Sequence, residues 1–207
     1  MKKLLIFLLI LGALAIIVGG WFVSTRNALV AQDEQVKSAW AQVENVYQRR
    51  LDLIPNLVST VKGVADFEQT TLTQVIQARA QATQISPEAV QNAINDPQAF
   101  QKFQAAQGAL SSALSRLMVV VERYPELKAN QNFLQLQSQL EGTENRIAVE
   151  RRRFNEVAQN YNTAIRRFPA SLVASMSGFA ARPYFAAEPG AAQAPKVDFS
   201  KPAESRP

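Results

Sequence analysis

Residues 133–168, FLQLQSQLEGTENRIAVERRRFNEVAQNYNTAIRRF, decide the fold. Their apolar positions alternate three and four apart over about five heptads, which predicts one long α-helix. Such a seam needs a partner helix along most of its length, within the chain or on a second copy. Only Thr143 and Glu150 interrupt it, and a buried Glu150 needs a partner such as an arginine from another helix. The seam residues are Phe133, Leu136, Leu140, Thr143, Ile147, Glu150, Phe154, Val157, Tyr161, Ala164 and Phe168.

The rest of the chain has helical spacing too. Apolar positions recur three or four apart in residues 27–50, 54–76 and 100–124. Ser86 and Asp96 are each followed by a proline, a pattern typical of helix starts, because the side chain caps free N–H groups and proline fits the first turn. No segment alternates with period two over a useful length. We therefore expect an all-α domain over residues 27–185, an antiparallel bundle of about four long helices.

Residues 1–26 predict a membrane anchor. A basic head of Lys2 and Lys3 precedes an uncharged apolar run from Leu4 to Val23. About 20 residues at 1.5 Å each cover the roughly 30 Å of a bilayer core, whereas the apolar part of a cleaved signal peptide usually has about 7–15 residues. We therefore expect an uncleaved single-pass helix. The two lysines favour a cytoplasmic N-terminus and an exported main domain, although Arg26 weakens this bias.

The composition argues against several classes of function. The 207 residues include no cysteine and no histidine, which removes thiol nucleophiles, disulfides, histidine triads and Cys/His zinc sites. We expect no metal and no cofactor. An enzyme would need two facing carboxylates, for which Asp66, Glu68 and Glu122 are ordinary surface candidates. The net charge of +5 is too mild to predict nucleic-acid binding, which usually shows a concentrated basic face.

The stretch RRLDLIPNLVSTVKG, residues 49–63, has two interpretations. In the structural one, Asp52 caps a helix and Pro55 lies in its first turn, so the stretch is a corner between two helices or a proline kink in one continuous helix. In the functional one, Arg50, Asp52 and Asn56 form a polar pocket for a ligand or partner. We favour the structural interpretation, because polar groups of this kind usually serve caps and turns.

A dense charge cluster over residues 140–154 is a second candidate surface. Its four arginines are Arg146, Arg151, Arg152 and Arg153. Together with nearby glutamates they predict a solvated face with ion pairs three or four apart. The alternative is a site for acidic lipid headgroups or an acidic partner.

The C-terminal region supplies a third candidate surface. After Pro169 we expect a short helix closed by Gly178, followed by an exposed aromatic patch of Phe179, Tyr184 and Phe185 that suits partner binding. Residues 186–207 are rich in Pro, Ala and Gly and predict a flexible tail.

Several long stretches together resemble the LemA family of bacterial membrane proteins. They are NALVAQDEQVKSAWAQVENVYQRRLDLIPNLVSTVKG at 27–63, QARAQA at 77–82, YPELKANQNFLQLQSQLEGTENRIAVERRRFNEVAQNYNTAIRRFP at 124–169, GFAARPYF at 178–185 and PKVDF at 195–199. The resemblance implies an N-terminal anchor in the bacterial inner membrane, followed by an antiparallel helical bundle. It implies no catalytic residues, because the family has no agreed biochemical activity.

These observations favour a non-enzymatic scaffold anchored in the membrane, with its bundle on the periplasmic side. It would act on copies of itself or on an unidentified envelope protein. The alternative is a receptor-like domain that binds a small molecule or envelope component between helices, and it predicts a sizeable cavity near Arg50 and Asn56.

Overall fold

The computed structural model describes residues 2–64 and 67–186, and within them it confirms an all-α fold without β-strands. Four helices are long, as predicted, and they are joined by short ones. The elements are α1 (Lys2–Lys62), α2 (Gln69–Thr83), α3 (Pro87–Gln91), the 3₁₀ turn η1 (Ala93–Asn95), α4 (Pro97–Val121), α5 (Pro125–Ala129), α6 (Gln131–Arg166) and α7 (Ala170–Met176). The tail predicted for residues 186–207 lies outside the described residues, apart from Ala186.

Helix starts follow the polar residues that precede the prolines. Ser86 Oγ accepts a hydrogen bond from the Ala89 N–H, and Asp96 accepts one from the Gln98 N–H. α7 ends as expected, because Gly178 has a φ of +74°, a left-handed conformation that residues with a Cβ rarely adopt.

α1 is one unbroken helix of 61 residues that contains both the apolar N-terminal run and the stretch 49–63. The predicted corner within 49–63 is therefore wrong, and the chain turns only after Lys62. The alternative of a continuous helix holds, with Pro55 inside it.

The environment of Pro55 explains why the helix continues. Proline has no N–H, so the carbonyl of Leu51 four residues earlier loses its usual intrahelical partner. Arg79 of α2 supplies a replacement, because its Nε donates to the Leu51 carbonyl oxygen at 3.1 Å. The proline thus turns a backbone carbonyl into an acceptor for a neighbouring helix, and it ties α1 to α2.

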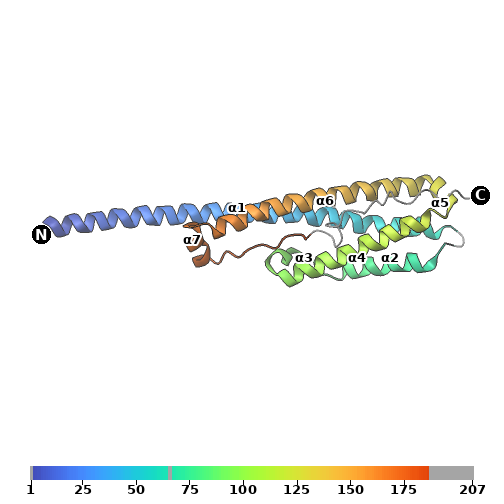
Figure 1. Cartoon of the computed structure of the whole chain (residues 1–207), viewed down its shortest axis with the longest axis horizontal. Coiled ribbons are helices and arrows are strands. Elements are labelled where there is room, and N and C mark those ends of the chain that lie inside the picture. The colour runs from blue at the N-terminus through green and yellow to red at the C-terminus, as the bar shows by residue number, and fades with distance from the viewer. Residues whose placement is uncertain (1, 65–66, 187–207) are drawn as a thin grey trace, which may run out of the picture.

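The bundle has two antiparallel pairs. α1 and α6 lie side by side, and α2 and α4 form the second pair against the half of α1 that is far from the N-terminus (Figure 1). α5 connects α4 to α6 at the end far from the anchor, whereas α7 lies beside α1 at the near end. Residues 4–21 of α1 extend beyond the bundle and are exposed. This segment is long and apolar enough to cross a membrane.

Two apolar clusters make up the core. The distal cluster, far from the anchor, gathers side chains of α1, α2, α4 and α6 from Leu51 to Leu140. The proximal cluster begins at Leu29 and is rich in aromatic rings. Trp40 lies at its centre, with the ring centroids of Phe100, Phe103 and Phe154 5.3–5.6 Å away.

The predicted seam of α6 is buried along most of its first half and shifts in the second. Phe154 and Tyr161 remain buried, but Ala158, Asn162 and Ile165 join them, and Phe168 is exposed beyond the end of the helix. The reason is that α7 and the segment after it cover another face of α6 here, so that this half of the helix packs on two sides.

Candidate interaction site

Arg50 is the centre of a buried polar layer between the two apolar clusters. Its side chain is 1% exposed, and Nη1 donates to Ser111 Oγ of α4 and to Glu144 Oε1 of α6, each at 2.7 Å. Nη2 donates to the Gln107 side-chain oxygen at 2.5 Å and to the Gln107 carbonyl at 3.2 Å. The guanidinium also lies over the ring of Tyr47, 5.1 Å from its centroid. The planar fork of arginine can serve all these acceptors at once, so Arg50 fixes the register of three helices.

The polar pocket predicted from Arg50, Asp52 and Asn56 does not form. Arg50 faces α4 and α6, whereas Asp52 and Asn56 are exposed on another face of α1. Asp52 instead accepts a hydrogen bond from Gln48 at 2.7 Å, one helical turn away. The physical reason is the uninterrupted helix, in which residues two apart point in directions about 200° apart.

Glu150 does not receive the arginine that we expected from another helix. The interhelical partner of Arg50 is Glu144, 41% exposed at the edge of the bundle, and not the seam residue Glu150. Glu150 lies 4.0 Å from its own neighbour Arg153. Burying the arginine against a carboxylate that still reaches water limits the cost of desolvating the pair.

The C-terminal strap, residues 179–186, is held along α6 by two asparagines. Asn155 donates to the Phe185 carbonyl at 3.0 Å and accepts from the Phe185 N–H at 2.9 Å. Asn162 makes the same pair of bonds to the backbone of Arg182, both at 2.8 Å, and donates to the Tyr184 hydroxyl at 2.9 Å.

The two spacings match. Asn155 and Asn162 are seven residues apart, about 10.5 Å along a helix. Arg182 and Phe185 are three residues apart, about 9–10 Å in an extended chain. Seven residues are nearly two turns of α6, so both amides point the same way. The strap is therefore recognised mainly through its backbone and runs antiparallel to α6.

The predicted exposed aromatic patch is wrong for two of its three residues. Phe185 is buried among the rings of Trp40, Phe100 and Phe154, with centroids 4.8–6.0 Å away. Phe179 is half-buried against the same cluster. Only Tyr184 is exposed. Once the strap lies on α6, its aromatic side chains complete the core instead of forming a surface.

Arg182 anchors the middle of the strap to α1. It donates to Asp33 Oδ1 at 2.5 Å and to the side chain of Asn95. Burial raises the pKa of Asp33, but the hydrogen bonds and charges of Arg182 and Lys37 outweigh it, so the pKa lies below its ordinary value. Lys37 completes the network, 3.0 Å from Asp33.

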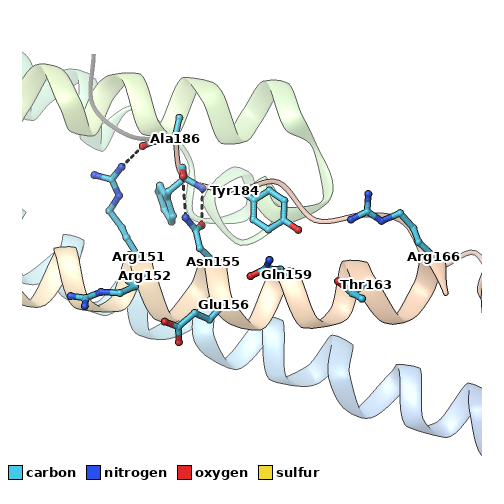
Figure 2. Close-up of a pocket in the computed structure, with 10 residues that line it drawn as sticks. Arg151, Arg152, Asn155, Glu156, Gln159, Thr163, Arg166, Tyr184 and Ala186 are labelled. Atoms are coloured by element: carbon cyan, nitrogen blue, oxygen red, sulfur yellow. Dashed lines mark hydrogen bonds between the residues drawn. The ribbon is translucent and has the colours of Figure 1, made fainter. Parts of the chain in front are cut away.

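A groove of about 660 Å³ lies between α6 and the strap, and we call it the basic groove. Arg151 reaches the Ala186 carbonyl at one end, and Arg166 lies at the other (Figure 2). Its lining residues are Arg151, Arg152, Asn155, Glu156, Gln159, Thr163, Arg166, Tyr184, Phe185 and Ala186. Three guanidinium groups against one carboxylate suit an anionic or acidic ligand.

Of the four arginines predicted from the charge cluster, Arg151 and Arg152 line this groove. Arg146 and Arg153 are exposed outside it. Arg151 also lies over the ring of Phe185, 4.8 Å from the centroid, and therefore helps to hold the strap. The four arginines therefore have different surroundings. Arg151 contacts the strap, Arg152 lines the groove, and Arg146 and Arg153 lie on the open surface.

The sequence reasoning missed Asn155, Asn162 and Arg182. A signal for the two asparagines existed, because each directly follows an aromatic seam residue and they lie one heptad apart. Arg182 carried no comparable signal, since its partner Asp33 is 149 residues away in the chain. Of the carboxylates considered for an enzyme, Glu68 is paired to Arg123 at 2.6 Å and Glu122 to Lys128 at 2.7 Å, both with partly or fully exposed side chains. Asp66 lies outside the described residues.

Comparison with curated proteins finds relatives along most of the chain. It is 27% identical over 177 residues to the Magnetosome protein MamQ of Magnetospirillum gryphiswaldense, an alignment that covers 79% of this chain and 65% of that protein. It is 24% identical over 158 residues to Protein LemA of Metamycoplasma hominis, which covers 74% of this chain and 65% of that protein. The chain thus spans about 65% of the length of these relatives.

The model of the LemA family matches residues 39–199, which are 161 of the 207 residues. The match includes the buried arginine layer, both asparagines of α6 and the whole strap. This protein belongs to the LemA family.

Proposed function

We propose that this protein is a non-enzymatic scaffold that holds the basic groove at a fixed height and direction above a bacterial inner membrane. The continuity of α1 carries this proposal. The helix that contains the apolar run continues without a break into the bundle, and Lys62 lies 39 residues beyond Val23. At 1.5 Å per residue this is about 58 Å of continuous helix. A flexible tether would not be built in this way.

The basic groove is the contact surface of the scaffold. Its lining combines Arg152 and Arg166 with the uncharged polar side chains of Gln159 and Thr163. Such a lining favours an acidic segment of a partner protein, bound in a shallow groove by charge-assisted hydrogen bonds.

A photo-crosslinking experiment tests the groove. A photoreactive amino acid replaces Gln159 in the full-length protein in cells, and we expect one crosslinked species of defined mass. The double variant Arg152→Glu, Arg166→Glu should abolish it, whereas the matched variant Arg146→Glu, Arg153→Glu outside the groove should not. A species of twice the chain mass identifies self-association, and another mass identifies a separate partner. Crosslinking that survives the groove variant refutes the proposed surface.

We also propose that the bundle is periplasmic, which the basic head Lys2 and Lys3 supports. The chain has no cysteine, so a single Val119→Cys variant reports the side directly. Val119 is exposed on α4. A membrane-impermeant maleimide should label it in intact spheroplasts, and labelling only after lysis contradicts the topology.

A second candidate function is favoured by a cavity of about 310 Å³ between α1, α2, α3 and α4. It lies beside Arg50, because its lining includes Tyr47 and Gln107, which both contact the Arg50 guanidinium. Asn56, the other residue near which we expected a cavity, does not line it. Glu44, Tyr47, Ile85, Val90 and Phe103 are among its lining residues. Glu44 Oε1 is buried and has no hydrogen-bond partner among the described residues. A small amine with an apolar body would satisfy this oxygen.

Thermal unfolding with ammonium compounds tests this receptor-like function. We expect n-butylammonium to raise the Tm of the full-length protein and neutral n-butanol not to do so. Glu44→Gln should remove the difference between the two compounds. Equal effects of both compounds on the wild type rule out a carboxylate-directed site.

A further inference from the structure

We propose that the turn after α6 together with α7, residues 166–176, forms a second membrane contact that rests on the bilayer surface beside the anchor. We call this segment the foot. The inference rests on the proposed function, because it requires that α1 crosses a membrane. It goes beyond that function, since it gives the bundle a second point of support and names a lipid surface as the partner of α7.

The foot exposes large apolar side chains. Phe168 is 76% exposed, Leu172 is 55% exposed and Met176 is 77% exposed. Leu172 and Met176 lie four residues apart and therefore on one face of α7. The opposite face packs inward, with Val173 and Ala174 buried. α7 therefore carries apolar side chains on both its buried and its exposed side, whereas a helix that faces water normally has polar side chains on its outer face.

The foot lies at the height where the apolar run of α1 ends. Along α1, burial begins with Phe22 and Thr25, which are partly covered, and becomes complete at Leu29. Leu29 belongs to the same core cluster as Ala174 of α7. Figure 1 shows α7 beside α1 at the end of the bundle that faces the anchor. The exposed apolar face of the foot therefore continues the exposed apolar surface of the anchor.

The charges around the foot fit lipid headgroups. Arg166 and Arg167 are the first two residues of the foot, and Arg26 lies just beyond the apolar run on α1; all three are exposed. Ala170–Met176 itself contains no charged residue. Cationic side chains beside an exposed apolar face are the arrangement of interfacial segments, in which the apolar side chains enter the acyl boundary and the arginines meet anionic phosphates. An acidic protein would satisfy the arginines but would leave three large apolar side chains without a partner.

Site-specific fluorescence tests the foot, because the chain contains no cysteine. Single cysteines replace Leu172 in the foot, Leu14 in the apolar run and Val119 on α4, and each carries an environment-sensitive dye. The labelled full-length proteins are reconstituted into vesicles of phosphatidylcholine or of an equimolar mixture with phosphatidylglycerol. Lipids that carry a quencher either near the headgroup or near the middle of the bilayer then report contact at both depths.

We expect lipid quenching of the Leu172 probe of the same order as that of the Leu14 probe, and none of the Val119 probe. Arg166→Gln and Arg167→Gln should each lower the ratio of docked to undocked foot about fivefold in the anionic vesicles, measured by the same quenching. In vesicles of phosphatidylcholine alone this loss should disappear.

The outcomes separate the foot from the anchor. Quenching at Leu14 without quenching at Leu172 overturns the foot and leaves the scaffold intact. Absence of quenching at Leu14 overturns the membrane span, and the foot with it. The three labelled sites are exposed, so the dye does not disturb the core.

Discussion

Replacing Arg50 by methionine should destabilise the bundle strongly. Arg50 is 1% exposed and donates to three side chains and one carbonyl. Without it, the side-chain oxygen of Gln107 remains inside the core without a donor, where Gln107 is 3% exposed, whereas the Gln107 carbonyl keeps its bond within α4. Each buried acceptor left without a donor costs about 1–3 kcal/mol. Glu144 is 41% exposed and regains water, so its loss of partner adds only about 0–1 kcal/mol.

We therefore expect Arg50→Met to lower the free energy of unfolding by about 1–4 kcal/mol, because one buried acceptor loses its donor and Glu144 loses its partner. Arg50→Lys keeps the charge but replaces a planar fork with one compact ammonium. This variant should still lower the free energy of unfolding by about 2 kcal/mol, because a single nitrogen cannot reach Ser111 and Gln107 of α4 and Glu144 of α6 together. The matched control is Arg49→Met at the exposed neighbouring position, which should change stability by less than about 0.5 kcal/mol.

Guanidinium chloride unfolding of the full-length protein in detergent measures these differences. Trp40 is buried in the proximal cluster and reports loss of tertiary structure. Trp21 lies in α1 outside the core, so all variants carry Trp21→Phe to remove its signal. If Arg50→Met unfolds within about 0.5 kcal/mol of the wild type, the polar layer does not hold the helices together and the reasoning fails.

Three further predictions concern single contacts. Arg79→Ala should lower the free energy of unfolding by about 1–3 kcal/mol in the wild type, but by less than about 1 kcal/mol in a Pro55→Ala background, because the backbone N–H at position 55 can then bond the Leu51 carbonyl. Equal costs in the two backgrounds of this double-mutant cycle would argue against the role of Arg79. Asn162→Leu should release the strap and open its aromatic residues to chymotrypsin, whereas Gln159→Leu on the same helix should not; equal digestion of both would contradict the clamp. The lowered pKa of Asp33 means that its ionised form stabilises the fold fully above the ordinary value of 3.8 and loses this effect as the pH falls further. The stability difference between wild type and Asp33→Asn should therefore shrink on acidification below that value, and a difference that does not change with pH would exclude the ion pair as its source.

The sequence was sufficient for the helical class, the antiparallel bundle and the helix starts at Ser86 and Asp96. These features depend on local spacing and on caps, which a linear pattern displays directly. The sequence also placed Thr143 at a seam position of α6. Thr143 is indeed buried, and its hydroxyl donates back to the Gln139 carbonyl at 2.7 Å. A buried polar residue can thus keep its place in a seam by bonding its own helix.

The course of α1 could not be predicted in the same way. Pro55 and Asp52 form a credible helix start, and the distant Arg79 supports the uninterrupted helix by occupying the carbonyl that proline leaves free. Likewise, the aromatic residues of the strap look like a surface patch until Asn155 and Asn162 bring Phe185 into the core. In both cases the deciding contact joins residues far apart in the chain, and no local pattern encodes it.

Because α1 is unbroken, the orientation of the bundle relative to the apolar run depends on the number of residues between them. A single residue inserted between Val23 and Leu29 would move the bundle about 1.5 Å away from the apolar run and rotate it by about 100° about the axis of α1. The basic groove would then lie on a different side of the transmembrane helix. The number of residues between the apolar run and the first buried leucine therefore sets which face of that helix lies under the groove, and hence which of its side chains meet a neighbour bound there.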